Sequence, residues 1–212
     1  MDNRLLIIAG PSGVGKTVVA KKIAEIDSRF TLLRSATTRK RRGDSHDDEY
    51  VYYTEEEFIK AIESGEIVES MTYLSNLYGT TTKEIDRAYR EGRIPLLVLD
   101  LKGVESLSLD KRFSASVIYI YAERDVIEKR LYGRIGDNPT QEEIDSVLSR
   151  IARNEADFAV LDDYSRYFYS TIENISTVES AAQEAIACFD GFSVGELPRK
   201  EKIEIALKKL KA

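Results

Sequence analysis

The chain has 212 residues, of which 42% are hydrophobic and 32% are charged, enough for one domain with a sizeable core. Its formal net charge of -6 gives no broad basic surface, so we expect no nucleic acid partner, and an anionic substrate must be held by local arginines. Cys188 is the single cysteine, which excludes an internal disulfide and a thiolate metal site and fits a reducing compartment.

The first apolar run, residues 5–9, is too short for a signal peptide core or a membrane span, so we expect a cytoplasmic protein with no membrane partner. The run is typical of a strand buried on both faces, and apolar residues at helical spacing follow from Lys16. Later strands are predicted at residues 94–99, 116–121 and 167–172, each followed by a helical stretch. This alternation predicts a parallel sheet covered by helices.

The pattern changes between residues 35 and 82. Tyrosine-rich segments at 50–53 and 67–73 surround one helical piece, residues 55–64, which Gly65 can end in the left-handed conformation. We therefore expect a small α+β lobe inserted into the core.

Two further segments stand out toward the C-terminus. Residues 135–141 contain glycine, asparagine and proline and predict a mobile loop between two helices. Residues 199–212 carry apolar side chains among many lysines, which predicts an amphipathic helix docked on the core, with a basic partner-binding helix as the alternative. The apolar positions of this tail are Ile203, Ile205, Leu207 and Leu210. The single histidine, His46, lies in an acidic stretch and is assigned no role.

Residues 10–17, with the sequence GPSGVGKT, fit the Walker A pattern and lie between a predicted strand and a predicted helix. The glycines let backbone N–H groups converge on β-phosphate oxygens at the positive end of the helix. Lys16 would reach the γ-phosphate, and the Thr17 hydroxyl would hold Mg²⁺ brought in with ATP. The residues expected to bind ATP here are Gly10, Pro11, Ser12, Gly13, Val14, Gly15, Lys16 and Thr17.

A phosphate loop does not by itself distinguish a kinase from an ATPase or a GTPase. Residues 100–103 (DLKG) follow a predicted strand and fit the D-x-x-G pattern of GTPases, but the sequence has no downstream N-K-x-D motif to read a guanine base. The inserted lobe also has no task in a GTPase. A kinase therefore explains more of the chain.

Residues 35–44 (SATTRKRRGD) place hydroxyl groups beside four basic side chains. Arginine forks match phosphate oxygens in pairs, so this segment can form a cradle for a monophosphate held ready for attack. A solvated basic loop would be the default interpretation of such a run in isolation. The acidic overall charge and the phosphate loop favour the cradle.

At these residues the sequence resembles the guanylate kinase family. Its S-x-T-T-R-x-P-R-x-G-E segment and following D-Y are similar to residues 35–44 and 49–50, and its acidic residue followed by Y-G-[ST] is similar to Glu69 and residues 78–80. Its D-x-D-x-x-G-V and R-L-x-x-R motifs are similar to residues 98–104 and 130–134. The resemblance covers about residues 5–174, with the motifs in the family's order.

The resemblance implies an α/β fold: a three-layer α/β/α P-loop kinase with a parallel core sheet, an inserted lobe that binds the nucleoside monophosphate, and a lid loop. We divide the chain into a core (1–34, 82–134 and 142–190), a GMP-binding lobe (35–81), a lid (135–141) and a basic C-terminal helix (198–212). The implied reaction moves the γ-phosphoryl group of ATP onto GMP, with use of dGMP left open. We expect a monomer or a homodimer.

Guanine presents two adjacent N–H donors, and one ionised carboxylate, that of Glu69, can accept both, whereas adenine offers no such pair. The resemblance implies that Ser35 donates to the guanine O6 and that Gly79, Thr80 and Asp100 complete the base site. It also implies that the phosphate of GMP is gripped by Arg39, Arg42, Tyr50 and Tyr78. For the two tyrosines, a place in the core or rim of a small sheet is the alternative.

Arg130 and Arg134 are four residues apart, so on a helix both would point the same way toward the transferring phosphoryl group. Arg150 resembles the family's arginine beyond its lid, and these three with Lys16 form the expected catalytic set, because phosphoryl transfer needs charge stabilisation more than a base. Arg153 is either a further catalytic arginine or part of a surface ion pair.

Other features of the resemblance concern the ATP site and the departures from the family. Asn174, after the last predicted strand, is implied to approach the adenine of ATP. Val98 replaces the first aspartate of D-x-D, and the missing proline near residue 41 leaves Arg41 and Arg42 as alternative phosphate ligands. The loop after Arg134 is longer than usual and lacks the family's acidic run.

Two alternatives to a guanylate kinase remain. One is a related P-loop kinase with another small phosphorylated acceptor. The other is a non-catalytic guanylate-kinase-like module that binds peptides, which Lys16 and Thr17 argue against, since such modules usually lose phosphate-loop residues.

Overall fold

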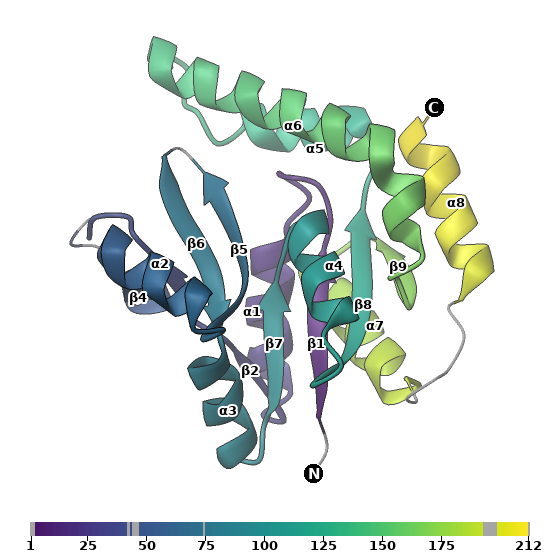
Figure 1. Ribbon diagram of the computed structural model, residues 1–212. Coiled ribbons are helices and arrows are strands. Elements are labelled where there is room, and N and C mark those ends of the chain that lie inside the picture. Colours follow the sequence, from purple (N-terminus) through teal and green to yellow (C-terminus); the bar gives the residue numbers. More distant parts are fainter. Residues whose placement is uncertain (1–2, 42, 44–46, 74, 193–198, 212) are drawn as a thin grey trace.

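The computed structural model of the protein describes residues 3–41, 43, 47–73, 75–192 and 199–211. Its larger sheet has five parallel strands in the order β2-β7-β1-β8-β9 (Figure 1). These strands are β1 (Arg4–Ala9), β2 (Phe30–Leu32), β7 (Ile94–Val98), β8 (Ser114–Tyr121) and β9 (Ser170–Glu173). The central strand β1 is apolar and buried along almost its whole length, as a strand covered on both faces requires.

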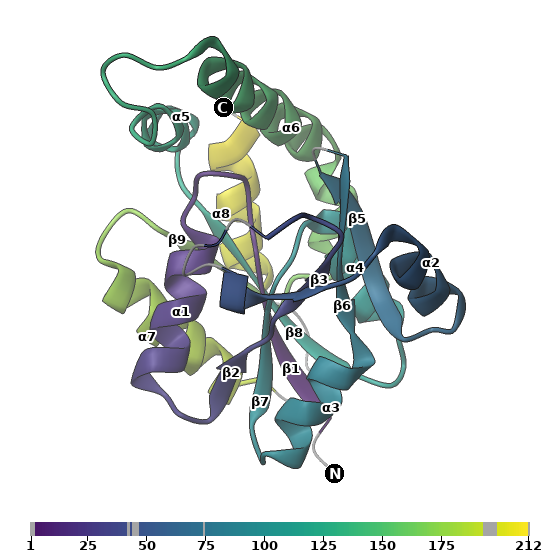
Figure 2. The same ribbon diagram turned by 90° about the vertical axis from the view of Figure 1, so that its left-hand side faces the viewer.

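Helices cover both faces of this sheet, which gives the three layers expected for the fold class (Figures 1 and 2). On one face α1 (Lys16–Ile26) packs against α7 (Val178–Asp190). On the other face α4 (Leu101–Leu109) packs against α6 (Gln141–Ser165), and α8 (Lys200–Lys211) packs on β9 and α6. The prediction of a parallel sheet wrapped by helices is therefore confirmed.

A second sheet of four strands is built from residues between β2 and β7, in the order β4-β3-β6-β5. Its strands are β3 (Ser35–Thr37), β4 (Tyr50–Tyr52), β5 (Ile67–Tyr73) and β6 (Asn76–Thr81), with the short 3₁₀ helix η1 (Asp47–Glu49) before β4. The helix α2 (Glu55–Glu63) covers a separate small apolar cluster on this sheet. The chain then returns to the large sheet through α3 (Thr82–Arg90).

Local sequence signals determine the ends of α2. Its first turn has a capping box, in which Thr54 and Glu57 satisfy each other's backbone N–H groups. After the helix, Gly65 has a φ of 72°, the left-handed conformation expected of a helix-ending glycine. A helix predicted over residues 55–64 is thus observed with nearly the same limits.

The helix α5 (Arg124–Tyr132) is shorter than the sequence indicated. Gly133 closes it by donating its N–H to the carbonyl oxygens of Lys129 and Leu131, so Arg134 follows the helix instead of lying on its last turn. The prediction that Arg130 and Arg134 share one helix face is therefore wrong. Residues 133–140 link α5 to α6, which begins at Gln141.

The last core strand also begins later than predicted, at Ser170 instead of residue 167. The N–H groups of Tyr167 and Phe168 bond back to the carbonyl oxygens of Tyr164 and Ser165, so these residues complete the turn after α6. In the tail, α8 buries Ile203, Ala206 and Leu210, as a docked amphipathic helix should. Ile205, expected on the apolar face, is instead 45% exposed.

The longest helix, α6, has 25 residues. Neither it nor any other helix within the described ranges is long and apolar enough to cross a membrane.

Candidate active site

The phosphate loop connects the end of β1 to the start of α1 and wraps around the ammonium group of Lys16. Nζ of Lys16 donates to the carbonyl oxygens of Gly10 at 2.7 Å and Pro11 at 3.0 Å. Gly10 and Gly15 have φ values of 146° and 103°, and a Cβ at Gly10 would lie 2.2 Å from the carbonyl oxygen of Ile120. Only glycine permits this backbone path.

The charge of Lys16 depends on residues from outside the loop. Burial lowers the pKa of Lys16 to about 8, and the Asp157 carboxylate opposes this more than any other group by favouring the charged form. Arg153 and Arg134 are also near enough for their charges to lower the pKa. Both Arg153 and Asp157 are in α6, so this helix contributes to the electrostatics of the phosphate loop.

Arg130 and Asn174 support the loop from beside it. Nδ2 of Asn174 donates to the carbonyl oxygen of Val14 at 2.7 Å, and Nη1 of Arg130 donates to the same oxygen at 3.2 Å. Nη2 of Arg130 also donates to the carbonyl oxygen of Asn174 at 2.8 Å. In this structure the polar groups of both residues are therefore directed at backbone atoms around the loop.

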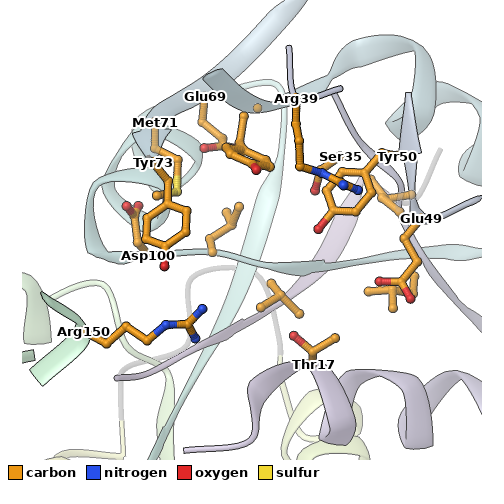
Figure 3. Close-up of a pocket in the computed structure, with 16 residues that line it drawn as sticks. Thr17, Ser35, Arg39, Glu49, Tyr50, Glu69, Met71, Tyr73, Asp100 and Arg150 are labelled. Carbon is orange, nitrogen blue, oxygen red and sulfur yellow. The ribbon is translucent and has the colours of Figure 1, made fainter. Parts of the chain in front are cut away.

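A cavity of about 460 Å³, lined by both polar and apolar side chains, lies between the phosphate loop and the second sheet (Figure 3). Thr17 and Arg150 lie at one side of it, and Glu69, Ser35, Arg39 and Tyr50 lie at the opposite side. The remaining lining residues are Leu32, Leu33, Glu49, Met71, Tyr73, Tyr78, Gly79, Val98, Leu99 and Asp100. The cavity thus brings together parts of the chain that are far apart in sequence.

Glu69 on β5 provides a buried carboxylate in one wall of this cavity. It is 8% exposed, and its Oε1 accepts a hydrogen bond of 2.7 Å from the hydroxyl of Thr80 on β6. Burial raises the pKa of Glu69 to about 7, the Thr80 hydroxyl opposes the rise, and the Asp100 charge adds to it. A proton on this carboxyl is therefore easily gained or lost near neutral pH.

The backbone near Glu69 is shaped by Gly79. The pairing of β5 with β6 shifts between Ile67 and Glu69, and a Cβ at Gly79 would lie 2.6 Å from the carbonyl oxygen of Glu69. A side chain at this position would therefore push the two strands apart. Gly79 serves the site through the close approach of its strand.

Asp100, the residue before α4, uses both of its carboxylate oxygens. Oδ1 accepts the N–H of Gly103 at 2.8 Å and so caps the helix, and Oδ2 accepts from Nη2 of Arg153 at 2.8 Å. Of the two roles considered for Arg153, the structure shows an ion pair, but with a cavity residue and not with a surface carboxylate.

Arg39 is held by groups from its own lobe. Its Nη2 donates to Tyr52 Oη at 3.1 Å and lies 3.3 Å from Oδ1 of Asp47, and its guanidinium lies 4.9 Å from the centre of the Tyr50 ring. Tyr52 also donates to Asp47, which is buried. The result is an arginine fixed in the cavity wall, with only 11% of its side chain exposed.

The other residues expected to bind the phosphate of GMP differ in whether they line the cavity. Tyr50 and Tyr78 both line the cavity, half-buried, with ring centres 6.1 Å apart. The guanidinium of Arg41 lies 4.3 Å from the centre of the Tyr52 ring, and Arg41 is absent from the described lining of the cavity. Arg42 lies outside the described residues, as does His46.

The arginines expected at the transferring group are at different places. Arg150 lines the cavity, with its guanidinium 5.9 Å from the Tyr73 ring centre, whereas Arg134 is exposed on the link between α5 and α6. Sequence reasoning missed Asn154, Asp157, Asp47 and Tyr52, which contact or influence the site from other elements. None of the four belongs to a local motif, so the sequence carried no signal for them.

A Walker loop that joins the central strand of a parallel sheet to a helix, and that faces a cavity under an inserted lobe, defines the class of P-loop kinases. A model of the guanylate kinase family matches residues 2–189. The chain belongs to the guanylate kinase family.

Individual relatives agree with this assignment. The chain is 31% identical over 192 residues to a guanylate kinase of Oceanobacillus iheyensis, covering 86% of this chain and 91% of that protein. It is 29% identical over 180 residues to a guanylate kinase of Rickettsia bellii, covering 82% and 92%. A crystal structure of guanylate kinase from Anaplasma phagocytophilum matches with a TM-score of 0.60 at 22% identity, over 89% of this chain and 86% of that chain, and supports the fold.

Proposed function

We propose that the protein is a guanylate kinase that transfers the γ-phosphoryl group of ATP to GMP, giving ADP and GDP. One observation carries the proposal: the buried carboxylate of Glu69 lines the same cavity as Thr17 of the phosphate loop, and arginine and tyrosine side chains line that cavity with them. A carboxylate in a low-dielectric wall is the group that a pair of guanine N–H donors requires.

The acceptor would bind with its base at Glu69 and its phosphate toward the loop. When Glu69 is ionised it accepts the two guanine N–H groups, Ser35 donates to O6, and Thr80 and Asp100 complete the polar ring. Arg39, Tyr50 and Tyr78 would grip the phosphate, since Arg39 is already held in the wall and the tyrosine hydroxyls donate without adding charge. Arg42 stays in this proposed set on the family resemblance, because the structure does not describe it.

The donor would occupy the phosphate loop. Residues 10–17 would hold the β-phosphate with backbone N–H groups, and Lys16 would turn from the carbonyl oxygens of Gly10 and Pro11 toward the γ-phosphate. Asn174 is proposed at the adenine side of this site. Its amide nitrogen already bonds to the carbonyl oxygen of Val14, so any contact with the base would come from another part of the residue or after a rearrangement.

Charge on the transferring group would be stabilised by Lys16 and the arginines of the lid region. Arg150 lines the cavity between the donor and acceptor sites and is the best supported of these. Arg134 would act after closure of residues 135–141, and Arg130 would act mainly by bracing the loop that holds the phosphates. The attacking oxygen belongs to an anionic phosphate, so no catalytic base is required.

Mg²⁺ would accompany ATP. Thr17 is exposed to the cavity and offers a hydroxyl oxygen, and the described residues contain no cluster of three acidic, histidine or cysteine side chains suited to a metal. This donor set fits an ion held mainly by nucleotide phosphates and water with one protein hydroxyl. When bound, the ion neutralises phosphate charge, while the residues of the chain orient the two nucleotides.

The test is ADP formation from ATP with each of GMP, dGMP, AMP, CMP and UMP as acceptor, for the wild type and for Glu69→Ala. We expect turnover with GMP and a loss of the preference for GMP over AMP in the variant. The proposal would be rejected if none of the nucleoside monophosphates supports turnover, or if a sugar phosphate, added as a further acceptor, is the only one that does. Sedimentation of the same preparation would distinguish a monomer from a homodimer.

A further inference from the structure

The helix α6 lies across the top of the molecule, above the ends of both sheets (Figures 1 and 2). It follows the link 133–140 directly and carries Arg150 on the turn that reaches the cavity. Two neighbouring residues further along, Arg153 and Asn154, form hydrogen bonds to two different parts of the site.

Asn154 holds the backbone of the phosphate loop. It is 4% exposed, its Oδ1 accepts the N–H of Ser12 at 2.7 Å, and its Nδ2 donates to the carbonyl oxygen of the same residue at 2.9 Å. Both polar ends of a buried amide are thus satisfied by one residue 142 positions away in sequence. This pair of bonds fixes the orientation of the Ser12 peptide groups, on which the direction of the following N–H groups depends.

Arg153 holds the acceptor side. Its Nη2 lies 2.8 Å from Oδ2 of Asp100, while Oδ1 of the same carboxylate caps α4. The Asp100 charge also raises the pKa of Glu69. By pairing with Asp100, Arg153 therefore orients the Asp100 carboxylate and reduces its repulsion of the Glu69 carboxylate.

We propose that Asn154 and Arg153 are positioning residues through which α6 holds the two nucleotide sites: Asn154 orders the phosphate loop for the donor, and Arg153 orders the Asp100 wall for the acceptor. The inference rests on the proposed function for the identity of the two ligands. Because the two contacts come from adjacent residues of one rigid helix, a movement of α6 would reach both sites together.

The proposal predicts opposite selectivity for the two single changes. Asn154→Ala should weaken ADP binding about tenfold, because the loop must then be ordered by the ligand, with GMP binding changed by less than about twofold. Arg153→Met should weaken GMP binding about tenfold and ADP binding by less than about threefold, and Arg153→Lys, which keeps the charge, should restore part of the loss.

The experiment is titration calorimetry of each full-length variant with ADP alone and with GMP alone, so that no turnover occurs. Glu155→Gln is the matched control, since Glu155 is exposed on the same helix and pairs with Arg124 at 2.8 Å, and it should bind both nucleotides like the wild type. Asn154→Ser replaces the alanine variant if the latter does not fold, as judged by its melting temperature.

A variant that weakens the binding of one nucleotide more than the other has lost a positioning residue, whereas a purely structural role would not discriminate between ADP and GMP. A variant of Asn154 that melts earlier but binds ADP normally, or one that weakens ADP and GMP equally, would overturn the Asn154 assignment. Normal GMP binding in Arg153→Met would overturn the assignment of Arg153. If the wild type binds ADP but not GMP, the proposed function fails, while the ADP measurements still decide the role of Asn154.

Discussion

The protonation state of Glu69 should control how tightly the acceptor binds. This carboxyl is buried, and its pKa is raised to about 7 from an ordinary 4.5. A protonated carboxyl can accept only one of the two guanine N–H groups well, and its own O–H would face a donor. Binding of GMP should therefore select the ionised form and release a proton when the pH is near or below 7.

The magnitude follows from the pKa. With a pKa of about 7, roughly one tenth of the free protein has Glu69 ionised at pH 6 and roughly nine tenths at pH 8. The dissociation constant for GMP should therefore fall by about tenfold between pH 6 and pH 8 and then level off. At pH 7, binding should release about half a proton from this group.

As the pH rises, the free energy of unfolding should fall while the affinity for GMP increases. Because the pKa is higher in the folded protein than in the unfolded chain, the folded state holds this proton more tightly between pH 4.5 and about 7. Glu69 should thus reduce the free energy of unfolding progressively as the pH rises through this range, by up to about 3 kcal/mol. Glu69→Gln should remove this part of the pH dependence.

The assay is titration calorimetry of GMP binding from pH 6 to pH 8, in buffers with different ionisation enthalpies so that released protons are counted. The phosphate of the nucleotide also titrates near pH 6, and Glu69→Gln serves to subtract this common contribution. Glu66→Gln is the matched control, since Glu66 lies on the same lobe, pairs with Lys83 and is not among the described lining residues of the cavity.

Between pH 6 and pH 8, we expect the affinity for GMP of the wild type and of Glu66→Gln to rise about tenfold more than that of Glu69→Gln, which should keep only the contribution of the nucleotide phosphate. An affinity of the wild type for GMP that is flat from pH 6 to pH 8, or one that changes with pH no more than the affinity of Glu69→Gln does, would refute the role assigned to this carboxyl.

Three further variants test other parts of the molecule. Lys16→Ala should lower kcat by about 10² to 10³ while GMP binding persists, because the positive charge that stabilises the transferring phosphoryl group is lost. Unchanged turnover would contradict the assignment of Lys16 to the ATP site. Arg39→Ala should weaken GMP binding about tenfold and leave ATP binding alone, as calorimetry can show, and equal weakening of both would assign this arginine to the donor. Burial alone would raise the pKa of Glu84, but hydrogen bonds from Arg34 and Arg87 lower it to about 2, so Glu84→Gln should destabilise the fold by about 2 kcal/mol at pH 7 in urea unfolding. The difference in the free energy of unfolding between Glu84→Gln and the wild type should narrow as the pH falls below about 4.5. A difference that does not change with pH would argue against the ion pairs of Glu84 as its source.

The departure at Val98 illustrates how the site depends on tertiary contacts. Val98 lies in the cavity wall where the family pattern places its first aspartate. The carboxylate that most favours the charged form of Lys16 is instead Asp157, on α6. A motif comparison shows that the aspartate is absent, but it cannot identify a carboxylate that acts from a helix elsewhere in the chain.

The sequence by itself determined the features that depend on near neighbours. Residues 10–17 have the glycines that a phosphate loop requires, the short apolar run of β1 is typical of a buried strand, and Thr54, Glu57 and Gly65 delimit α2. Each of these follows from the conformational limits and hydrogen-bonding needs of a few consecutive residues.

Only the tertiary structure decided which side chains meet. Arg153 pairs with Asp100, Asn154 binds the backbone of Ser12, and Glu69 is buried against Thr80, and each of these contacts joins separate elements. Contacts of this kind arise from packing across the fold, and the spacing of residues along the chain carries no record of them.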